Sequence, residues 1–361
     1  MKWVRLSSVV LVGVFTALLV ALLLLSRELL QAHIDETILR FASDASVYYD
    51  YYVETYAGTN PLDNWTVFLR ASPVLLMMLT RGSLLAIQLF NLALMLITLR
   101  VAFDCFRTFH GRMLFLLFCL IFPYFSFGFM SLNKEVYAMC AAIFYGSYMI
   151  RGRFWHLALA LLLALSARYY MVASLMMLAV VIPRTGSVRY LWILAALIGI
   201  SLLAPLIKTF IPEYSYENLL DGSGGTAILM AKVIDNFGYA PLYMLKYLLL
   251  LLVRPYGLLI GSTEDAIGAV VSIASLVMVT AGLYVLWLGR AKNPVISRLI
   301  LAAFVAPIPM MWSEIMHWRY YSFVYFFLLN AVVLHLESVW LARPSRVADN
   351  PDALPVAGLS Q

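Results

Sequence analysis

Two carboxylates lie among aromatic side chains between residues 27 and 73, a stretch that separates two strongly apolar runs and holds seven of the nineteen acids. Asp44 and Asp50 stand six residues apart in SDASVYYDYYVETYAG, which also carries five tyrosines. Aromatic, partly apolar surroundings raise the proton affinity of a carboxylate. We therefore expect Asp44 or Asp50 to take a proton from a hydroxyl or to hold a divalent cation such as Mg²⁺ or Mn²⁺.

The same stretch also fits an amphipathic helix that lies on a membrane surface with a belt of aromatic rings. If it is helical, residues 44, 48, 51, 52 and 55 share one face, whereas Asp50 and Glu54 share another. This alternative needs no chemistry, and the loop by itself leaves both interpretations open.

Charged residues also interrupt the apolar runs further along the chain. Lys134 and Glu135 stand in FMSLNKEVYAM, where an ordinary helix end with Asn133 as N-cap is the simpler interpretation. Arg168 lies in the middle of LALALLLALSARYYMVASLMMLAV. An unpaired arginine at the centre of a membrane span costs at least about 2.5 to 3.5 kcal/mol. The sequence therefore predicts two short spans that meet at Arg168 and Tyr169.

A second group of candidate binding residues lies near the end of the chain. Arg254 precedes Pro255, and His317, Arg319 and Tyr320 occur together in SEIMHWRYYSF. The planar guanidinium group suits phosphate, and a histidine can relay a proton near neutral pH. A lipid-linked phosphate or pyrophosphate is the ligand that these cations favour. Four tyrosines are suited to stacking on sugar rings: Tyr48, Tyr49, Tyr169 and Tyr320. The alternative for each cation is a side chain that extends to the membrane interface.

Composition predicts the fold class. The chain is 63% hydrophobic and 12% charged, with a mean hydropathy of +0.89. Repeated apolar runs near the ~20 residues that cross a bilayer indicate an all-α, polytopic transmembrane helical bundle. About ten spans are predicted, with interfacial or re-entrant helices in the outer loops. They are placed near residues 6–26, 82–103, 113–131, 136–150, 155–167, 170–183, 190–209, 266–288, 298–312 and 320–338.

Charge distribution predicts the orientation. With both termini in the cytoplasm, each short cytoplasmic connection carries at least two positive charges, and fifteen of the nineteen acids fall on the other side. The net charge of +6 then reflects membrane orientation, so nucleic-acid binding is not expected. The three cysteines lack the spacing of a metal site or a disulfide framework and are expected to pack in the interior.

We expect one membrane domain over residues 1–341, with an acidic first outer loop at 27–73 and a second long outer loop at 210–264. Within the second loop, residues 238–260 are apolar enough to cross the membrane but are interpreted as an interfacial or re-entrant helix, because a crossing would reverse the later topology. Residues 342–361 are expected to form a disordered cytoplasmic tail.

These features together resemble the C-type (GT-C) membrane glycosyltransferases over most of the chain to about residue 338. The likeness is carried by SDASVYYDYYVETYAGTN, ASPVLLMML, RGSLLAIQLFNLALML, SLNKE, ARYY and HWRYYSF. The resemblance implies that an acid of the first outer loop is the catalytic base or metal ligand, which maps to Asp44, with Asp50 as the second choice. It also implies a polyprenyl-phosphate-linked sugar donor and a glycan or lipid-linked acceptor.

The chain is also similar to bacterial exopolysaccharide and O-antigen polymerases, which act on undecaprenyl-pyrophosphate-linked glycans. For such a polymerase, Arg168, Arg254 and Arg319 are the positions of interest. A transporter for the same kind of lipid is a third expectation, although no internal repeat is visible. All three place the chain in a bacterial cytoplasmic membrane, and the favoured expectation is a glycosyltransferase that works at the outer face.

Overall fold

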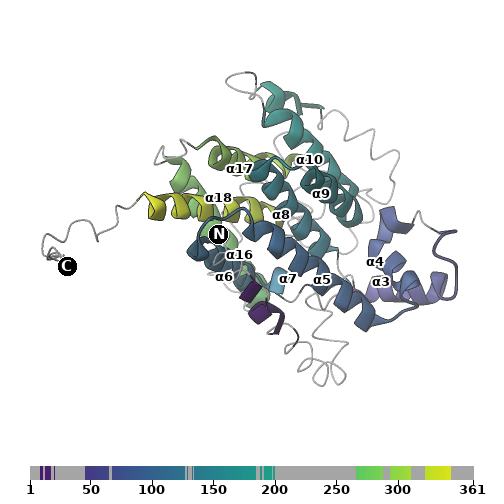
Figure 1. Cartoon of the computed structure of the whole chain (residues 1–361). Coiled ribbons are helices and arrows are strands. Elements are labelled where there is room, and N and C mark those ends of the chain that lie inside the picture. The colour runs from purple at the N-terminus through teal and green to yellow at the C-terminus, as the bar shows by residue number, and fades with distance from the viewer. Residues whose placement is uncertain are drawn as a thin grey trace, which may run out of the picture.

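The computed structural model describes residues 9–10, 13–17, 20, 45–64, 67–126, 128, 132, 134–183, 188, 191–196, 198–199, 266–287, 293–309 and 322–342. Every regular element in these residues is a helix, and they contain no β-strand (Figure 1). The all-α fold class is therefore confirmed for the part of the chain that is described. The predicted second loop at 210–264 and tail residues 343–361 lie outside it.

The first predicted loop contains its own helical unit. Helix α3 spans Ala45–Tyr51 and continues as the π-helix η2, Tyr52–Tyr56. Helix α4, Val67–Leu79, packs against both. The unit has a small core that is separate from that of the main bundle. It consists of Tyr52, Val74, Met77, Met78 and Ile87.

Helix α4 continues across Pro73, the expected end of the first outer loop. Pro73 lies inside this helix, although proline cannot donate the helical hydrogen bond. A tight turn at Arg81 and Gly82 then leads into α5, Leu84–Phe103, whose N-cap Ser83 accepts a hydrogen bond from the amide of Ala86 at 3.3 Å. A strong capping side chain here marks where the apolar helix α5 begins.

The span predicted over 113–131 is interrupted in the structure. Helix α6 covers Phe109–Ile121, and the short helix α7 covers Pro123–Ser126. Phe122 between them is extended, with ψ 104°. A residue that precedes proline is disfavoured in the helical conformation, so Pro123 accounts for the break.

The two short helices predicted on either side of Arg168 are confirmed. Helix α9 spans Phe154–Ala167, helix α10 spans Tyr169–Val181, and Arg168 between them is extended, with φ −164° and ψ 131°. They follow α8, Glu135–Arg151, which ends at Gly152 in the left-handed conformation.

Helices α8 and α18 form the centre of the bundle. After α16, Ala266–Trp287, and α17, Pro294–Val305, the chain enters α18, Ser322–Leu341. Residues 135–147 of α8 and 324–333 of α18 are buried without interruption. A helix that is buried on all sides is surrounded by other helices, and α5, α6, α9, α16 and α17 pack around these two (Figure 1).

Two glycines allow the neighbours of α18 to come close. A Cβ atom at Gly282 of α16 would lie 2.8 Å from Leu328, and one at Gly146 of α8 would lie 3.0 Å from Asn330. Small residues at such crossings are typical of helices packed within a membrane.

The outer faces of the surrounding helices are apolar. Phe109, Met113, Leu117 and Ile121 repeat every four residues along α6, and all four side chains are exposed. Ile273, Val277 and Tyr284 are likewise exposed on α16. Two described helical stretches, Leu84–Phe103 and Val324–Leu341, are long and apolar enough to cross a membrane. The larger number of about ten spans stays a prediction.

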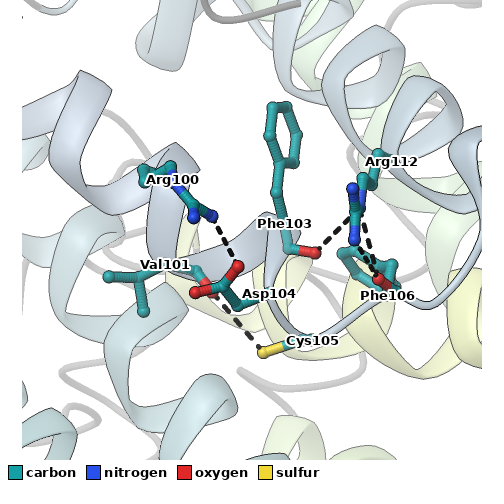
Figure 2. A network of polar contacts seen from close by, with 7 residues as sticks. All are labelled: Arg100, Val101, Phe103, Asp104, Cys105, Phe106 and Arg112. Atoms are coloured by element: carbon teal, nitrogen blue, oxygen red, sulfur yellow. Dashed lines mark hydrogen bonds and ion pairs between the residues drawn. The ribbon is translucent and has the colours of Figure 1, made fainter. Parts of the chain in front are cut away.

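The connection between α5 and α6 is a polar region at the end of α5 that lies away from the first-loop unit (Figure 1). Figure 2 shows its contacts around Arg112. The buried Arg112 guanidinium donates hydrogen bonds to the carbonyl oxygens of Phe103 and Phe106, at 2.9 to 3.2 Å. The Glu337 carboxylate of α18 accepts hydrogen bonds from the amide and hydroxyl of Thr108.

All three cysteines are free and buried, as the sequence predicts. Cys105 lies in the connection between α5 and α6, with its Sγ atom 3.8 Å from the carbonyl oxygen of Val101 (Figure 2). Burial raises the pKa of the Cys105 thiol, so this group remains protonated and unreactive near neutral pH.

Candidate functional site

Glu135 and Arg168 form an ion pair that joins α8 to the junction of α9 and α10. The Arg168 Nη2 atom donates to Glu135 Oε1 at 2.9 Å. The Glu135 side chain is 3% exposed and that of Arg168 is 16% exposed. Two predicted site residues that are 33 positions apart in the sequence therefore meet in a largely buried place.

Lys134 connects this pair to the first-loop unit. Its Nζ atom lies 5.2 Å from the centre of the Tyr48 ring of α3, within the range of a cation–π interaction. The Lys134 side chain is buried, and that of Tyr48 is partly buried. We call the group formed by Tyr48, Lys134, Glu135 and Arg168 the cationic junction.

The backbone supports the same meeting point. The Ser72 hydroxyl of α4 donates a hydrogen bond to the carbonyl oxygen of Ser166, two residues before Arg168. Leu132, just before Lys134, packs against the small core of the first-loop unit. Four segments that are distant in sequence thus converge at the cationic junction, and each is held by a separate contact.

Both cations of the junction occupy positions that ordinary helices avoid. Lys134 is the N-cap residue of α8, and Arg168 is the N-cap residue of α10. Neither side chain caps its helix, and helix N-termini carry a partial positive charge that repels cations. Glu135 in the first turn of α8 offsets part of this charge. The arrangement concentrates positive potential from two side chains and two helix ends, which suits an anionic ligand.

The interpretation of Lys134 and Glu135 as a plain helix end is therefore incomplete. The N-cap residue is Lys134, whereas Asn133 lies outside the described residues. Glu135 does occupy the first helical turn, as that interpretation requires, but its carboxylate is committed to Arg168.

The expected shared face of the first-loop helix is wrong. Tyr51 is 38% exposed, whereas Tyr52 is 9% exposed and belongs to the small core. The change from α3 to the wider η2 helix at Tyr52 alters the angular spacing of the side chains. Asp50 and Glu54 are both exposed, so the Asp50 carboxylate lies on the surface and the structure does not bring it into the junction.

Several predicted site residues lie outside the described part of the chain. These are Asp44, Arg254, His317, Arg319 and Tyr320. Tyr169 is described only as the first residue of α10. Among the described residues, no three His, Cys, Asp or Glu side chains are grouped so that they could hold a metal ion. The divalent-cation expectation at Asp44 therefore stays a prediction.

Sequence reasoning identified each charged member of the junction but not how they are paired. It assigned Tyr48 to sugar stacking and gave Ser72 and Ser166 no part. The sequence signal for Ser166 was its position two residues before Arg168, where the apolar run is interrupted.

The protein was compared with protein-family models, with curated proteins and with solved structures, and no match was found in any of the three.

Proposed function

We propose that this chain is a polytopic membrane glycosyltransferase that transfers a sugar from a polyprenyl-phosphate-linked donor to an acceptor hydroxyl at the outer face of a bacterial cytoplasmic membrane. The observation that carries the proposal is the cationic junction. It combines two largely buried cations, two helix N-termini and the aromatic ring of Tyr48.

The apolar outer surface supports the membrane part of the proposal. Exposed side chains such as Leu117 of α6 and Val277 of α16 lie in rows with no charged residue between them. Contiguous apolar faces of this kind are unfavourable in water and favourable against lipid. A span count of about ten, with both termini in the cytoplasm, would put the cationic junction at the outer surface.

In the proposed reaction, the acceptor hydroxyl oxygen attacks the anomeric carbon of the donor. The bond from that carbon to the phosphate oxygen breaks, and the lipid phosphate leaves with the bonding electron pair. Asp44 would take the hydroxyl proton, or position a cation, four residues before Tyr48. Lys134 and Arg168 would stabilise the charge that develops on the leaving phosphate, because preorganised donors act most strongly in a dry site.

The test uses the purified full chain in lipid nanodiscs. Transfer is measured from a polyprenyl-monophosphate sugar and from a polyprenyl-diphosphate oligosaccharide. We expect turnover with the monophosphate donor, loss of turnover in Asp44→Asn, and near-normal turnover in the control Asp63→Asn, which changes another first-loop acid. Arg168→Ala should weaken the use of the donor more than that of the acceptor.

The outcomes separate the alternatives. Turnover with the diphosphate oligosaccharide alone would assign the chain to the polysaccharide polymerases. Full activity of Asp44→Asn would reject the assignment of the base, and no turnover with either donor would favour a lipid transporter.

A further inference from the structure

We infer that the turn between α8 and α9 binds an anionic phospholipid, with the lipid phosphate at Arg151 and Arg153 and an acyl chain along the exposed face of α9. We call residues 151–155, with the sequence RGRFW, the basic turn. It lies at one end of α9, and the cationic junction lies at the other. The inference rests on the membrane placement in the proposed function, but it requires no sugar transfer.

The basic turn presents two arginines to solvent. Arg151 is the last residue of α8, Arg153 is the N-cap residue of α9, and both are exposed. Only Gly152 and Arg153 join the two helices, which pack side by side (Figure 1). The charges of both arginines act on the imidazole of His156 in the first turn of α9. Two guanidinium groups held this close together are suited to the oxygen atoms of one phosphate.

The acids near the basic turn are engaged elsewhere. The charge of Asp104 also acts on His156, but the Asp104 carboxylate is paired with Arg100. Neither Arg151 nor Arg153 forms an ion pair in the described part of the chain. The turn therefore carries an excess of positive charge that attracts an anion. A zwitterionic lipid would bring its own ammonium group to the same place, so charge favours an anionic lipid.

An exposed apolar face of α9 begins at the same turn. Phe154 is 76% exposed, Trp155 is 45% exposed and Leu162 is 53% exposed. Phe154, Ala158 and Leu162 repeat every four residues, and Trp155 precedes Leu162 by two helical turns, so all four lie on one side of the helix. The helix contains no lysine, arginine, aspartate or glutamate.

The arrangement of charge and apolar surface selects a lipid among anionic ligands. A soluble anion would use the two arginines and leave Phe154, Trp155 and Leu162 exposed to water. A phospholipid uses both parts, because its phosphate lies at the membrane interface, where tryptophan and arginine side chains are favoured. Helix α9 has 14 residues and a length of about 21 Å, whereas the hydrocarbon of one leaflet is about 15 Å thick. One acyl chain therefore fits along the exposed face.

The experiment measures lipid binding to the delipidated full chain in detergent by native mass spectrometry. The probes are dioleoyl-phosphatidylglycerol, which is anionic, and dioleoyl-phosphatidylcholine, which is zwitterionic and has the same acyl chains. We expect about tenfold higher affinity for phosphatidylglycerol. The double variant Arg151→Gln with Arg153→Gln should lose this preference. Trp155→Ala should weaken the binding of both lipids by a similar factor, because the ring faces the hydrocarbon of either one.

The matched control is Arg107→Gln with Arg298→Gln, which removes the same charge from two other exposed arginines. This control should keep the preference. An equal loss in both double variants would show general attraction to a positive protein and would overturn the inference, as would equal affinity of the parent chain for the two lipids.

The other occupants of the basic turn would give different results. Competition by glycerol phosphate at the concentration of the lipid would assign the turn to a soluble anion, and a dimer that the Arg151 and Arg153 double variant abolishes would assign it to a second copy of the chain. Either result would overturn the inference. Selective binding of phosphatidylglycerol by a chain that transfers no sugar would reject the proposed function and retain the lipid site.

Discussion

Arg112 and Arg168 are two shielded arginines at opposite ends of the bundle, and their surroundings differ in electrostatic sense. Arg112 donates to the carbonyl oxygens of Phe103, the last residue of α5, and of Phe106. A cation at the C-terminus of a helix is favourable. Arg168 instead stands at the N-terminus of α10, where a cation is unfavourable, and it pairs with the Glu135 carboxylate.

The charged residues near these two arginines differ in the same way. In the connection between α5 and α6, the Glu337 carboxylate lies against Thr108 at the N-terminus of α6, so acid and helix end are matched (Figure 2 shows the Arg112 side of this region). In the cationic junction, Lys134 adds a second cation at a helix N-terminus. Matched charges hold a structure together, whereas excess positive charge at helix N-termini is suited to an anion that comes from outside. Under the proposed function, this difference separates Arg112, a structural arginine, from Arg168, a binding one.

The largest effect is expected from breaking the ion pair of the junction. Glu135→Leu removes the carboxylate that pairs with the shielded Arg168, which should lower the free energy of unfolding by about 3 to 5 kcal/mol. Denaturant unfolding in detergent measures this. The double variant Glu135→Leu with Arg168→Leu should recover most of the loss, and a single-variant cost below about 1 kcal/mol would show that the pair is not the main support of this region.

A smaller loss is expected from Arg112→Ala. The buried carbonyl oxygens of Phe103 and Phe106 would lose charged donors, at a cost of about 2 to 3 kcal/mol in unfolding free energy. Farnesyl phosphate serves as a short analogue of the polyprenyl-phosphate ligand. Its affinity, measured without denaturant under conditions in which the variant stays folded, should be unchanged. Weakened binding would contradict a purely structural role for Arg112.

Lys134→Ala should separate stability from binding. The change removes the interaction with the Tyr48 ring, worth about 0.5 to 2 kcal/mol, but also relieves about 0.3 to 1 kcal/mol of repulsion at the α8 N-terminus. The unfolding free energy should therefore change by less than about 1 kcal/mol, while affinity for farnesyl phosphate falls about tenfold. Lys134→Arg is the matched control and should retain most of the affinity. Equal affinity of the alanine variant and the parent chain would remove Lys134 from the anion site.

The smallest effect is expected at the exposed ion pair between Arg100 and Asp104, one helical turn apart. Both side chains are close to half exposed, at 47% and 44%. Asp104→Asn should change the unfolding free energy by less than about 0.5 kcal/mol. The same measurement as for Glu135→Leu then compares an exposed pair with a buried one, and a similar loss at both would invalidate the distinction between the two regions.

The two helices that meet at Arg168 could be predicted from the sequence, because a single cation is costly in the middle of a long apolar helix. The run had to end near Arg168, and α9 and α10 do so within one residue. The break at Phe122 was missed although Pro123 was visible, since the apolar pattern continues through it. At Phe122 the conformational restriction imposed by Pro123 ends the helix, although hydrophobicity alone predicts that the helix continues.

The candidate site was predicted in part. Lys134, Glu135 and Arg168 were recognised because charges among apolar residues are costly and therefore conspicuous. Their pairing depends on the packing of α9 beside α8, and the contact of Lys134 with Tyr48 depends on how α3 approaches the N-terminus of α8, neither of which a local pattern encodes. The π-helical turn at Tyr52, where Tyr52 is buried while Tyr51 is exposed, was equally beyond a fixed helical period.

The sequence by itself determined the helical class, the helix ends at Ser83, Thr108 and Gly152, and the types of residue available for chemistry, because capping, proline and hydrophobicity act over a few residues. Only the tertiary structure decided which charges meet. An ion pair across 33 residues and a cation over a ring 86 residues away form only when separate helices pack together. Electrostatic contacts between distant residues therefore follow from packing. At the cationic junction, packing brings two helix N-termini and two cations together.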